Sequence, residues 1–129
     1  FCFVMTKFEL EYPVKSSVKV LYDSLVDSSK LTEWFCDDIT LYDNGKKMEF
    51  FWEGSGQTAN VIGKKDNQFI KWQWEDEEDN TYFELRIQID EITNDVALIV
   101  TDFAEDDELE EAKMLWDNQI RDLFISLGA

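Results

Sequence analysis

The sequence has no histidine, two cysteines, one proline, and only 12 lysine or arginine residues against 29 aspartate or glutamate residues in 129 positions. Without histidine, the chain cannot build a His-dependent catalytic triad, an imidazole general base or a His-ligated zinc site. The net charge of −17 argues against nucleic-acid binding, which depends on lysine and arginine, and against docking on anionic lipid. We therefore expect no nucleic-acid partner and no membrane partner.

The sequence also lacks the cysteine spacing of metal or redox sites and the long apolar runs of membrane-spanning segments. Cys2 and Cys36 lack the spacing of a metal site or a redox motif, so we interpret Cys36 as a free structural thiol; a disulfide between the two is the alternative. No apolar run approaches the roughly 18 residues that a membrane span requires. The apolar residues 1–5 are too short for a signal peptide, and Met5 is a candidate for the true start. We expect a cytoplasmic protein with no metal and no cofactor.

Apolar and aromatic residues are plentiful, at 44% and 15% of the chain. This composition is too hydrophobic for a disordered chain, even at such a high net charge. The length of 129 residues is enough to bury a core without disulfides or metals and suits one domain, which we place at residues 6–127.

The first third of the chain predicts one strand followed by two short helices. Residues 7–12 alternate between charged and apolar side chains, the pattern of a strand with one face in water. Pro13 ends this strand, and apolar residues recur at helical spacing over residues 18–25, after a serine that can cap the helix. A second short helix is expected after residues 27–29, with Leu31, Trp34 and Phe35 on one side and Asp37-Asp38 at its end.

A run of strands occupies the middle of the chain. Alternation and turn signals predict strands over residues 39–41, 47–53, 57–65, 69–74, 82–89 and 96–103. Asn44-Gly45 is a hairpin signal, and Gly54-Ser55-Gly56 marks the next turn. The last strand is apolar on both faces around residues 97–100, which indicates a central position or a covered outer face.

One long helix is expected at the C-terminal end. Its apolar stripe consists of Leu109, Ala112, Trp116, Ile120, Leu123 and Leu127. Asp107 and Glu110 predict a capping box at its start, and Gly128 predicts its end. The whole pattern predicts an α+β fold, in which a curved antiparallel sheet of six or seven strands wraps around this helix. Because the two curvatures cannot match everywhere, we expect a gap between sheet and helix, which is the candidate site.

Three sequence strings resemble those of a known family. They are Val20-Leu21-Tyr22-Asp23-Ser24-Leu25, Lys30-Leu31-Thr32-Glu33-Trp34-Phe35 and Trp116-Asp117-Asn118-Gln119-Ile120. With the order of elements from Thr6 to Leu127, they are similar to the START-like helix-grip superfamily, also called SRPBCC. The nearest branch resembles the C-terminal domain of the activator of the Hsp ATPase. The resemblance implies that the first two strings build paired helices closing one end of a cavity, and that the third lies on the C-terminal helix.

The resemblance specifies fold better than function, because members include lipid and hormone binders, cyclases and chaperone activators. Asp102 stands at the end of the last strand, where relatives often carry a histidine. The sequence also shows no separate N-terminal chaperone-binding domain. Chaperone activation is therefore an alternative function and not the leading one.

Five tryptophans fall on predicted inward positions. Aromatic walls provide a large contact area for an apolar ligand such as a lipid, a sterol-like molecule or a polycyclic molecule. The alternative is that these rings only fill the core. We predict a small hydrophobic ligand in the gap, bound by Trp34, Phe35, Phe50, Trp52, Trp72, Trp74, Phe83, Leu85, Leu98, Trp116 and Ile120.

The charged residues offer further candidates. The acidic runs at Glu75–Asp79 and residues 105–111 lack the spacing of a calcium loop, so we expect solvated faces, with a basic protein partner as the next option. Arg86 is expected to pair with Glu84 across its strand face, and Arg121 to complement the dipole of the last helix.

Catalytic motifs are lacking: the chain has no nucleophile elbow, dinucleotide fingerprint or phosphate loop. The polar residues closest to predicted apolar surfaces are Glu33, Asp37, Asp38, Asp102, Tyr22 and Tyr42, and no two of them form an acid–base pair by spacing. We predict no catalytic residues, and keep a cyclase-like enzyme and an acidic, chaperone-modulating module as alternatives. Phe51, Phe69 and Ile99 on the outer face favour a homodimer.

Overall fold

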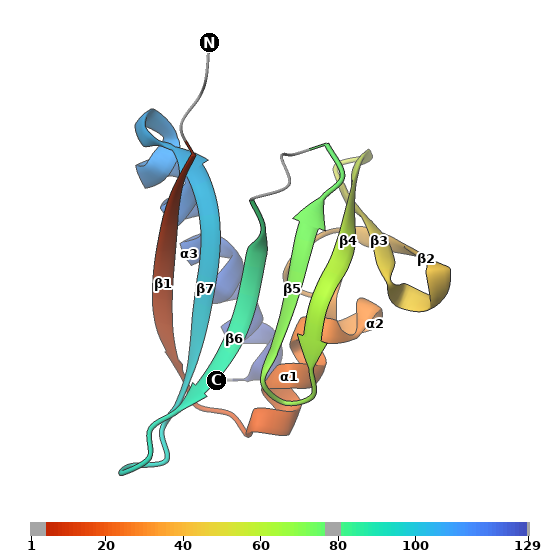
Figure 1. Cartoon of the computed structure of the whole chain (residues 1–129). Coiled ribbons are helices and arrows are strands. Elements are labelled where there is room, and N and C mark those ends of the chain that lie inside the picture. Colours follow the sequence, from red (N-terminus) through yellow and green to blue (C-terminus); the bar gives the residue numbers. More distant parts are fainter. Residues whose placement is uncertain (1–4, 77–80, 129) are drawn as a thin grey trace.

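The computed structural model describes residues 5–76 and 81–128 and contains one seven-stranded antiparallel sheet with helices against one face (Figure 1). The strands are β1 (Met5–Val14), β2 (Asp38–Tyr42), β3 (Lys47–Trp52), β4 (Ser55–Lys65), β5 (Phe69–Trp74), β6 (Phe83–Ile89) and β7 (Val96–Glu105). The helices are α1 (Val18–Val26), α2 (Ser28–Leu31) and α3 (Leu109–Leu127), with 3-10 turns η1 (Asp43–Gly45) and η2 (Asp106–Glu108). The predicted α+β helix-grip architecture is confirmed.

The strand order is β1-β7-β6-β5-β4-β3-β2, so the first two strands lie at opposite edges of the sheet. From β2 to β7, consecutive strands pair as antiparallel neighbours. α1 and α2 carry the chain from one edge to the other (Figure 1). β7 lies between β1 and β6 as the second strand from the edge, and its outward apolar residues Ala97 and Ile99 are half-buried.

The alternation of side chains along each strand separates a buried face from an outer face. In β6, for example, Phe83 and Leu85 are at most 1% exposed. The buried side chains of α3 are Trp116, Ile120 and Leu123, which follow the predicted apolar stripe. Sheet and helix therefore share one hydrophobic core, whose burial is the main stabilising contribution to the fold.

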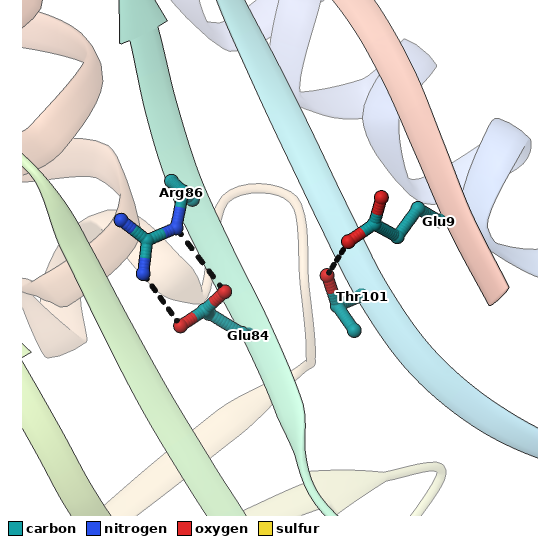
Figure 2. A network of polar contacts seen from close by, with 4 residues as sticks. All are labelled: Glu9, Glu84, Arg86 and Thr101. Carbon is teal, nitrogen blue, oxygen red and sulfur yellow. Dashed lines mark hydrogen bonds and ion pairs between the residues drawn. The ribbon is translucent and has the colours of Figure 1, made fainter. Parts of the chain in front are cut away.

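Two polar contacts lie on the outer face of the sheet, away from the helices (Figure 1, Figure 2). Arg86 Nη2 lies 3.1 Å from Glu84 Oε2, as predicted, and on the neighbouring strands Thr101 Oγ1 donates a hydrogen bond of 3.4 Å to Glu9 Oε2. Because Arg86 is well exposed, its ion pair contributes at most about 1 kcal/mol. This face is stabilised locally and holds no part of the predicted ligand site.

Two side-chain hydrogen bonds tie α3 to strands β1 and β7. The Tyr12 hydroxyl donates to Asp117 Oδ1 at 2.6 Å, and Trp116 Nε1 donates to Asp102 Oδ2 at 2.9 Å. Burial, followed by the hydrogen bond with Asp117, raises the pKa of Tyr12, so this hydroxyl remains a donor at neutral pH. These bonds fix the direction of α3 over the sheet.

The second helix is shorter than the sequence predicts. Asp27 caps α2 with its side chain, but α2 ends at Leu31 instead of continuing to Phe35. The backbone N–H groups of Phe35 and Cys36 both donate to the Leu31 carbonyl, at 2.8 and 3.3 Å, so the chain leaves the helix in a series of turns. These turns direct Trp34 and Phe35 into the core, where each is 4% exposed.

The start of α3 also differs from the prediction. The chain forms the 3-10 turn η2 first, and Glu108 then precedes α3 without a side-chain cap, so the predicted capping box of Asp107 and Glu110 is wrong. The predicted end is confirmed, because Gly128 adopts a left-handed conformation with φ of 70°. Arg121 lies outside the last turn, which contains no basic residue, so its predicted role at the helix dipole is wrong as well.

The tight turns between strands follow the sequence with one shift. Asn44-Gly45 forms the β2–β3 turn as predicted. The β3–β4 turn consists only of Glu53 and Gly54, whose φ angles of 51° and 84° are both left-handed, and β4 begins directly afterwards. Gly56, predicted to belong to the turn, instead pairs with Phe51, and an added Cβ would lie 2.8 Å from the Phe51 ring. The small residue is required by this close packing.

Candidate ligand-binding site

Phe35, in the turns after α2, lies at the centre of an aromatic cluster between the sheet and α3. Its ring centroid lies 5.1–5.9 Å from those of Trp34, Phe50, Trp52, Phe83 and Trp116. On the sheet, Trp72 and Trp74 stack on Phe83 at 4.9 and 5.1 Å. Aromatic pairs at such distances add roughly 0.5–1.5 kcal/mol each beyond the burial of their surface. The cluster therefore joins the turns after α2, the sheet and α3 through ring contacts.

The structure brings the predicted ligand-binding residues together in one core. The fully enclosed ones, at 0–1% exposure, are Phe50, Trp72, Phe83, Leu85, Leu98 and Ile120. Trp34, Phe35 and Trp116 are 4–6% exposed, and Trp52 and Trp74 are half-buried. The rings thus occupy most of the gap expected between sheet and helix, and a ligand that entered it deeply would have to displace them.

Open space lies at the edge of the aromatic cluster, in a cleft of about 580 Å³ between residues 32–37 and α3. Trp34, Phe35 and Trp52 are the predicted residues that line it. The other lining residues are Thr32, Glu33, Cys36, Asp37, Leu115, Asn118, Gln119 and Asp122. The volume falls within the range of about 300–1,000 Å³ typical of small-molecule sites.

The carbonyl of Phe35 fixes the floor of the cleft. It accepts hydrogen bonds from Trp52 Nε1 at 2.8 Å and from Gln119 Nε2 at 3.0 Å. Trp34 Nε1 donates to the Ser24 carbonyl at 2.8 Å. The turns after α2 are thereby joined to β3, α3 and α1, so the aromatic floor is held in place before any ligand arrives.

Sequence reasoning did not find the α3 wall of the cleft. Leu115, Asn118, Gln119 and Asp122 follow the spacing i, i+3, i+4, i+7 and form one side of α3. This side flanks the apolar stripe, and its mainly polar composition is typical of a solvated surface. The available signal was the position of these residues around Trp116 on the same helix, within or beside the string that carries the family resemblance.

The cleft is acidic. Glu33, Asp37 and Asp122 line it, and no lysine or arginine does so among the residues that the structure describes. Burial, followed by the negative charges of Asp37 and Asp38, raises the pKa of the Cys36 thiol to about 12. Cys36 is therefore a protonated, weakly reactive thiol and no candidate nucleophile.

Of the polar residues considered for catalysis, Glu33 and Asp37 line the cleft, and the others lie outside it. Asp102 accepts hydrogen bonds from Trp116 Nε1 and from the Phe103 N–H, which gives it a structural role. Tyr42 donates to Glu49 at 3.1 Å on the β2–β3 hairpin. The Tyr22 hydroxyl is buried without a hydrogen-bond partner in the described part of the chain, and burial raises its pKa. These positions form no acid–base constellation.

The acidic runs are surface features. In the first run, Glu75 is exposed and lies 3.4 Å from Lys47 Nζ, whereas residues 77–80 are outside the described residues. In the second run, one carboxylate oxygen from each of Glu105, Asp107 and Glu108 lies within 4.8 Å of the other two. Asp107 and Glu108 are exposed, and Glu105 is half-buried. Desolvation, followed by the negative charges of Glu108 and Asp107, raises the pKa of Glu105. Such clusters are common on solvated faces.

None of the helices that the structure describes combines the length and the apolar character needed to cross a membrane.

Comparison with known proteins supports the resemblance seen in the sequence. The model of a START-like superfamily domain matches residues 4–129, whereas a search of curated proteins finds no match. Similar solved structures include the Aha1 dimer from Colwellia psychrerythraea, with a TM-score of 0.77 and 18% identity over 95% of this chain and 96% of that one.

Two further structures have the same TM-score of 0.77. Protein MLL2253 from Mesorhizobium loti is 13% identical over 95% of this chain and 97% of its own. Protein SSP2350 from Staphylococcus saprophyticus is 16% identical over 95% of this chain and 92% of its own. Likeness at these identities supports the fold alone. With a sheet gripping its C-terminal helix and a family match over nearly its whole length, the chain belongs to the START-like superfamily.

Proposed function

We propose that this START-like domain binds a small ligand with an apolar body in the cleft between residues 32–37 and α3. The observation that carries the proposal is the cleft itself, about 580 Å³ in volume, with Trp34, Phe35 and Trp52 among its walls. In this proposal these three residues contact the ligand. The other predicted residues, Phe50, Trp72, Trp74, Phe83, Leu85, Leu98, Trp116 and Ile120, support the site from beneath. The binding unit is the single domain predicted over residues 6–127.

The site is proposed for binding and not for catalysis. Its walls offer apolar surface and hydrogen-bonding groups, and its thiol is protonated because the pKa of Cys36 is raised to about 12. A cytoplasmic location belongs to the same proposal, since a free cysteine such as Cys36 is usual in reducing compartments.

A neutral apolar fluorophore, N-phenylnaphthylamine, tests the proposal. We expect saturable binding, followed by probe emission, and about fivefold weaker binding in a Leu115→Ser variant. The reason is that Leu115 lines the cleft and its contact with the probe would contribute about 1 kcal/mol. Leu115 is 60% exposed, so its replacement should leave the fold intact.

Met114→Ser is the matched control, because Met114 is the preceding residue of α3, is 64% exposed and does not line the cleft. The affinity of this variant should equal that of the wild type. Equal losses in both variants, or no saturable binding to the wild type, would contradict the proposal.

A homodimer through α3 is a second candidate. The outward residues Phe51, Phe69 and Ile99 are only half-buried, and Arg86 lies over the Phe69 ring at 4.7 Å. More exposed apolar surface lies on α3, where Met114 and Ile125 are 64% and 72% exposed. An antiparallel pairing of two α3 helices about a two-fold axis would place Met114 of one copy beside Ile125 of the other. The similar Aha1 structure is a dimer.

Sedimentation velocity tests this association. We expect a dimer whose population rises with salt, because screening weakens the repulsion between two chains of net charge −17. An Ile125→Asp variant should be monomeric, whereas Ile92→Asp, at a residue 92% exposed in the β6–β7 turn, should behave as the wild type. A monomeric wild type at all salt concentrations would contradict the second candidate.

The acidic, chaperone-modulating module remains the alternative function. Its support is the net charge of −17 and the exposed Glu75 and Asp76 at the end of β5. A basic partner would be held by long-range attraction and released by salt.

A further inference from the structure

We infer that the cleft selects cationic ligands, namely molecules that join an ammonium group to an apolar or aromatic body. The inference rests on the proposed function and narrows its ligand class. The aromatic floor of the cleft would contact the apolar body of the ligand. The acidic residues that line the same cleft, Glu33, Asp37 and Asp122, here called the rim, would determine which head group binds.

The acidic side chains come from both walls of the cleft. Glu33 and Asp37 lie on the turns after α2, and Asp122 lies on α3. A head group between the walls would therefore meet carboxylates on two sides. Among the described residues, no lysine or arginine lines the cleft to offset them.

These carboxylates are not neutralised by ion pairs within the part of the chain that the structure describes. The ion pairs found there join Lys19 to Asp23, Lys47 to Glu75 and Arg86 to Glu84, and none includes a residue of the cleft. Within the described residues, the carboxylates of the rim therefore have no basic side chain as an ion-pair partner.

Among the three acidic residues, Asp37 has a carboxylate held by a backbone hydrogen bond within the described part of the chain. Its Oδ2 accepts a hydrogen bond of 2.8 Å from the Glu53 N–H, which fixes the carboxylate, while Oδ1 has no hydrogen bond to any described residue. A carboxylate held in this way can accept a charge-assisted hydrogen bond from an ammonium group at little cost in side-chain entropy.

The aromatic floor adds to the preference for a cation. Trp52 is half-buried at the cleft, and tryptophan is the aromatic side chain that attracts cations most strongly. A ligand with a carboxylate or phosphate head would instead face like charges without a basic residue to bind it. Burial raises the pKa of Cys36 most, and the charge of Asp37, which lines the same cleft, raises it further.

Three probes that share a naphthalene body and differ in charge test the inference: naphthylmethylamine, naphthylmethanol and naphthoate. Affinities are measured by isothermal titration at about 50 mM and about 500 mM salt, where charge interactions are weakly and strongly screened. We expect the amine to bind at least about tenfold more tightly than naphthoate at low salt, with naphthylmethanol between them, and a smaller difference at high salt.

Variants distinguish the effect of charges in the cleft from the effect of the net charge of the whole chain. Combined Glu33→Gln, Asp37→Asn and Asp122→Asn substitutions should remove most of the preference, while naphthylmethanol binds unchanged. Glu91→Gln is the control, because Glu91 is an exposed carboxylate in the β6–β7 turn and does not line the cleft. It should leave the preference as it is.

Equal binding of the three probes, tighter binding of naphthoate, or a preference that persists in the triple variant would overturn the inference. In each case the proposed function would stand, because a naphthalene body still binds. If neither these probes nor N-phenylnaphthylamine bind, the proposed function fails together with the inference.

Discussion

Replacing Phe35 by alanine should lower the free energy of unfolding by about 3–5 kcal/mol, the range observed when a buried phenylalanine is truncated. The ring is 4% exposed and contacts five other aromatic rings that come from the turns after α2, two strands and α3. Its removal leaves a cavity that these rings cannot fill without leaving their present positions. Urea denaturation followed by tryptophan emission measures the change.

Phe51→Ala is the matched control for this substitution. Phe51 lies on β3 but is only half-buried, with its ring beside Gly56 on the neighbouring strand. We expect its truncation to cost less than half as much as that of Phe35. Equal losses would mean that the aromatic cluster is not the centre of stability in this fold.

Cys36 should react with iodoacetamide about a thousandfold more slowly at pH 8 than an ordinary thiol. A pKa of about 12, instead of 9.0, lowers the fraction of reactive thiolate by about this factor, and the burial of the side chain slows the reaction further. Because the thiol form predominates below pH 12, the rate should rise about tenfold for each increase of one pH unit. Mass spectrometry of quenched samples, prepared from a Cys2→Ser variant, follows this thiol alone.

The same measurement reports on the charge of the cleft. Asp37 raises the pKa of Cys36 and lines the same cleft, so Asp37→Asn should speed the reaction severalfold at constant pH. Unfolding the protein in guanidinium chloride should restore the rate of an ordinary thiol. A native rate at pH 8 that already equals the unfolded rate would contradict the description of Cys36 as buried in an acidic environment.

The buried thiol of Cys36 also makes the folded protein less stable at alkaline pH. Since the folded-state pKa of Cys36 lies above its ordinary value of 9.0, the protonated thiol stabilises the fold at lower pH, and this contribution is lost as the pH rises above about 9. The raised pKa of Tyr12 acts in the same direction above pH 10.0.

The strands and the long helix could be predicted because burial on one face leaves a direct periodic signal. The alternation in β6 and the stripe of Trp116, Ile120 and Leu123 on α3 each follow from packing against the same core. The apolar residues on both faces of β7 indicated a central position or a covered outer face, and β7 lies inside the sheet as the second strand from the edge. The order of elements, a run of strands followed by one long helix, predicted that the sheet wraps around the helix, and the family resemblance implied the same arrangement.

The cleft could not be predicted to the same extent, because one of its walls depends on the residue at which α2 ends. Helical spacing placed Trp34 and Phe35 on a second helix, but the backbone leaves the helix at Leu31. The position of the open space depends on those turns. Tryptophans such as Trp72 gave no sign of whether they would line a cavity or fill it, because both roles need an inward aromatic side chain.

Chemical-shift mapping of the ¹⁵N-labelled protein with N-phenylnaphthylamine tests the central claim most directly. If the cleft between residues 32–37 and α3 binds the apolar body of a ligand, amide signals of those turns and of residues 115–122 should shift together and saturate. Signals of the β6–β7 turn and of the outer face around Arg86 should remain in place. Saturating shifts confined to those distant regions, or no shifts at all, would contradict the account.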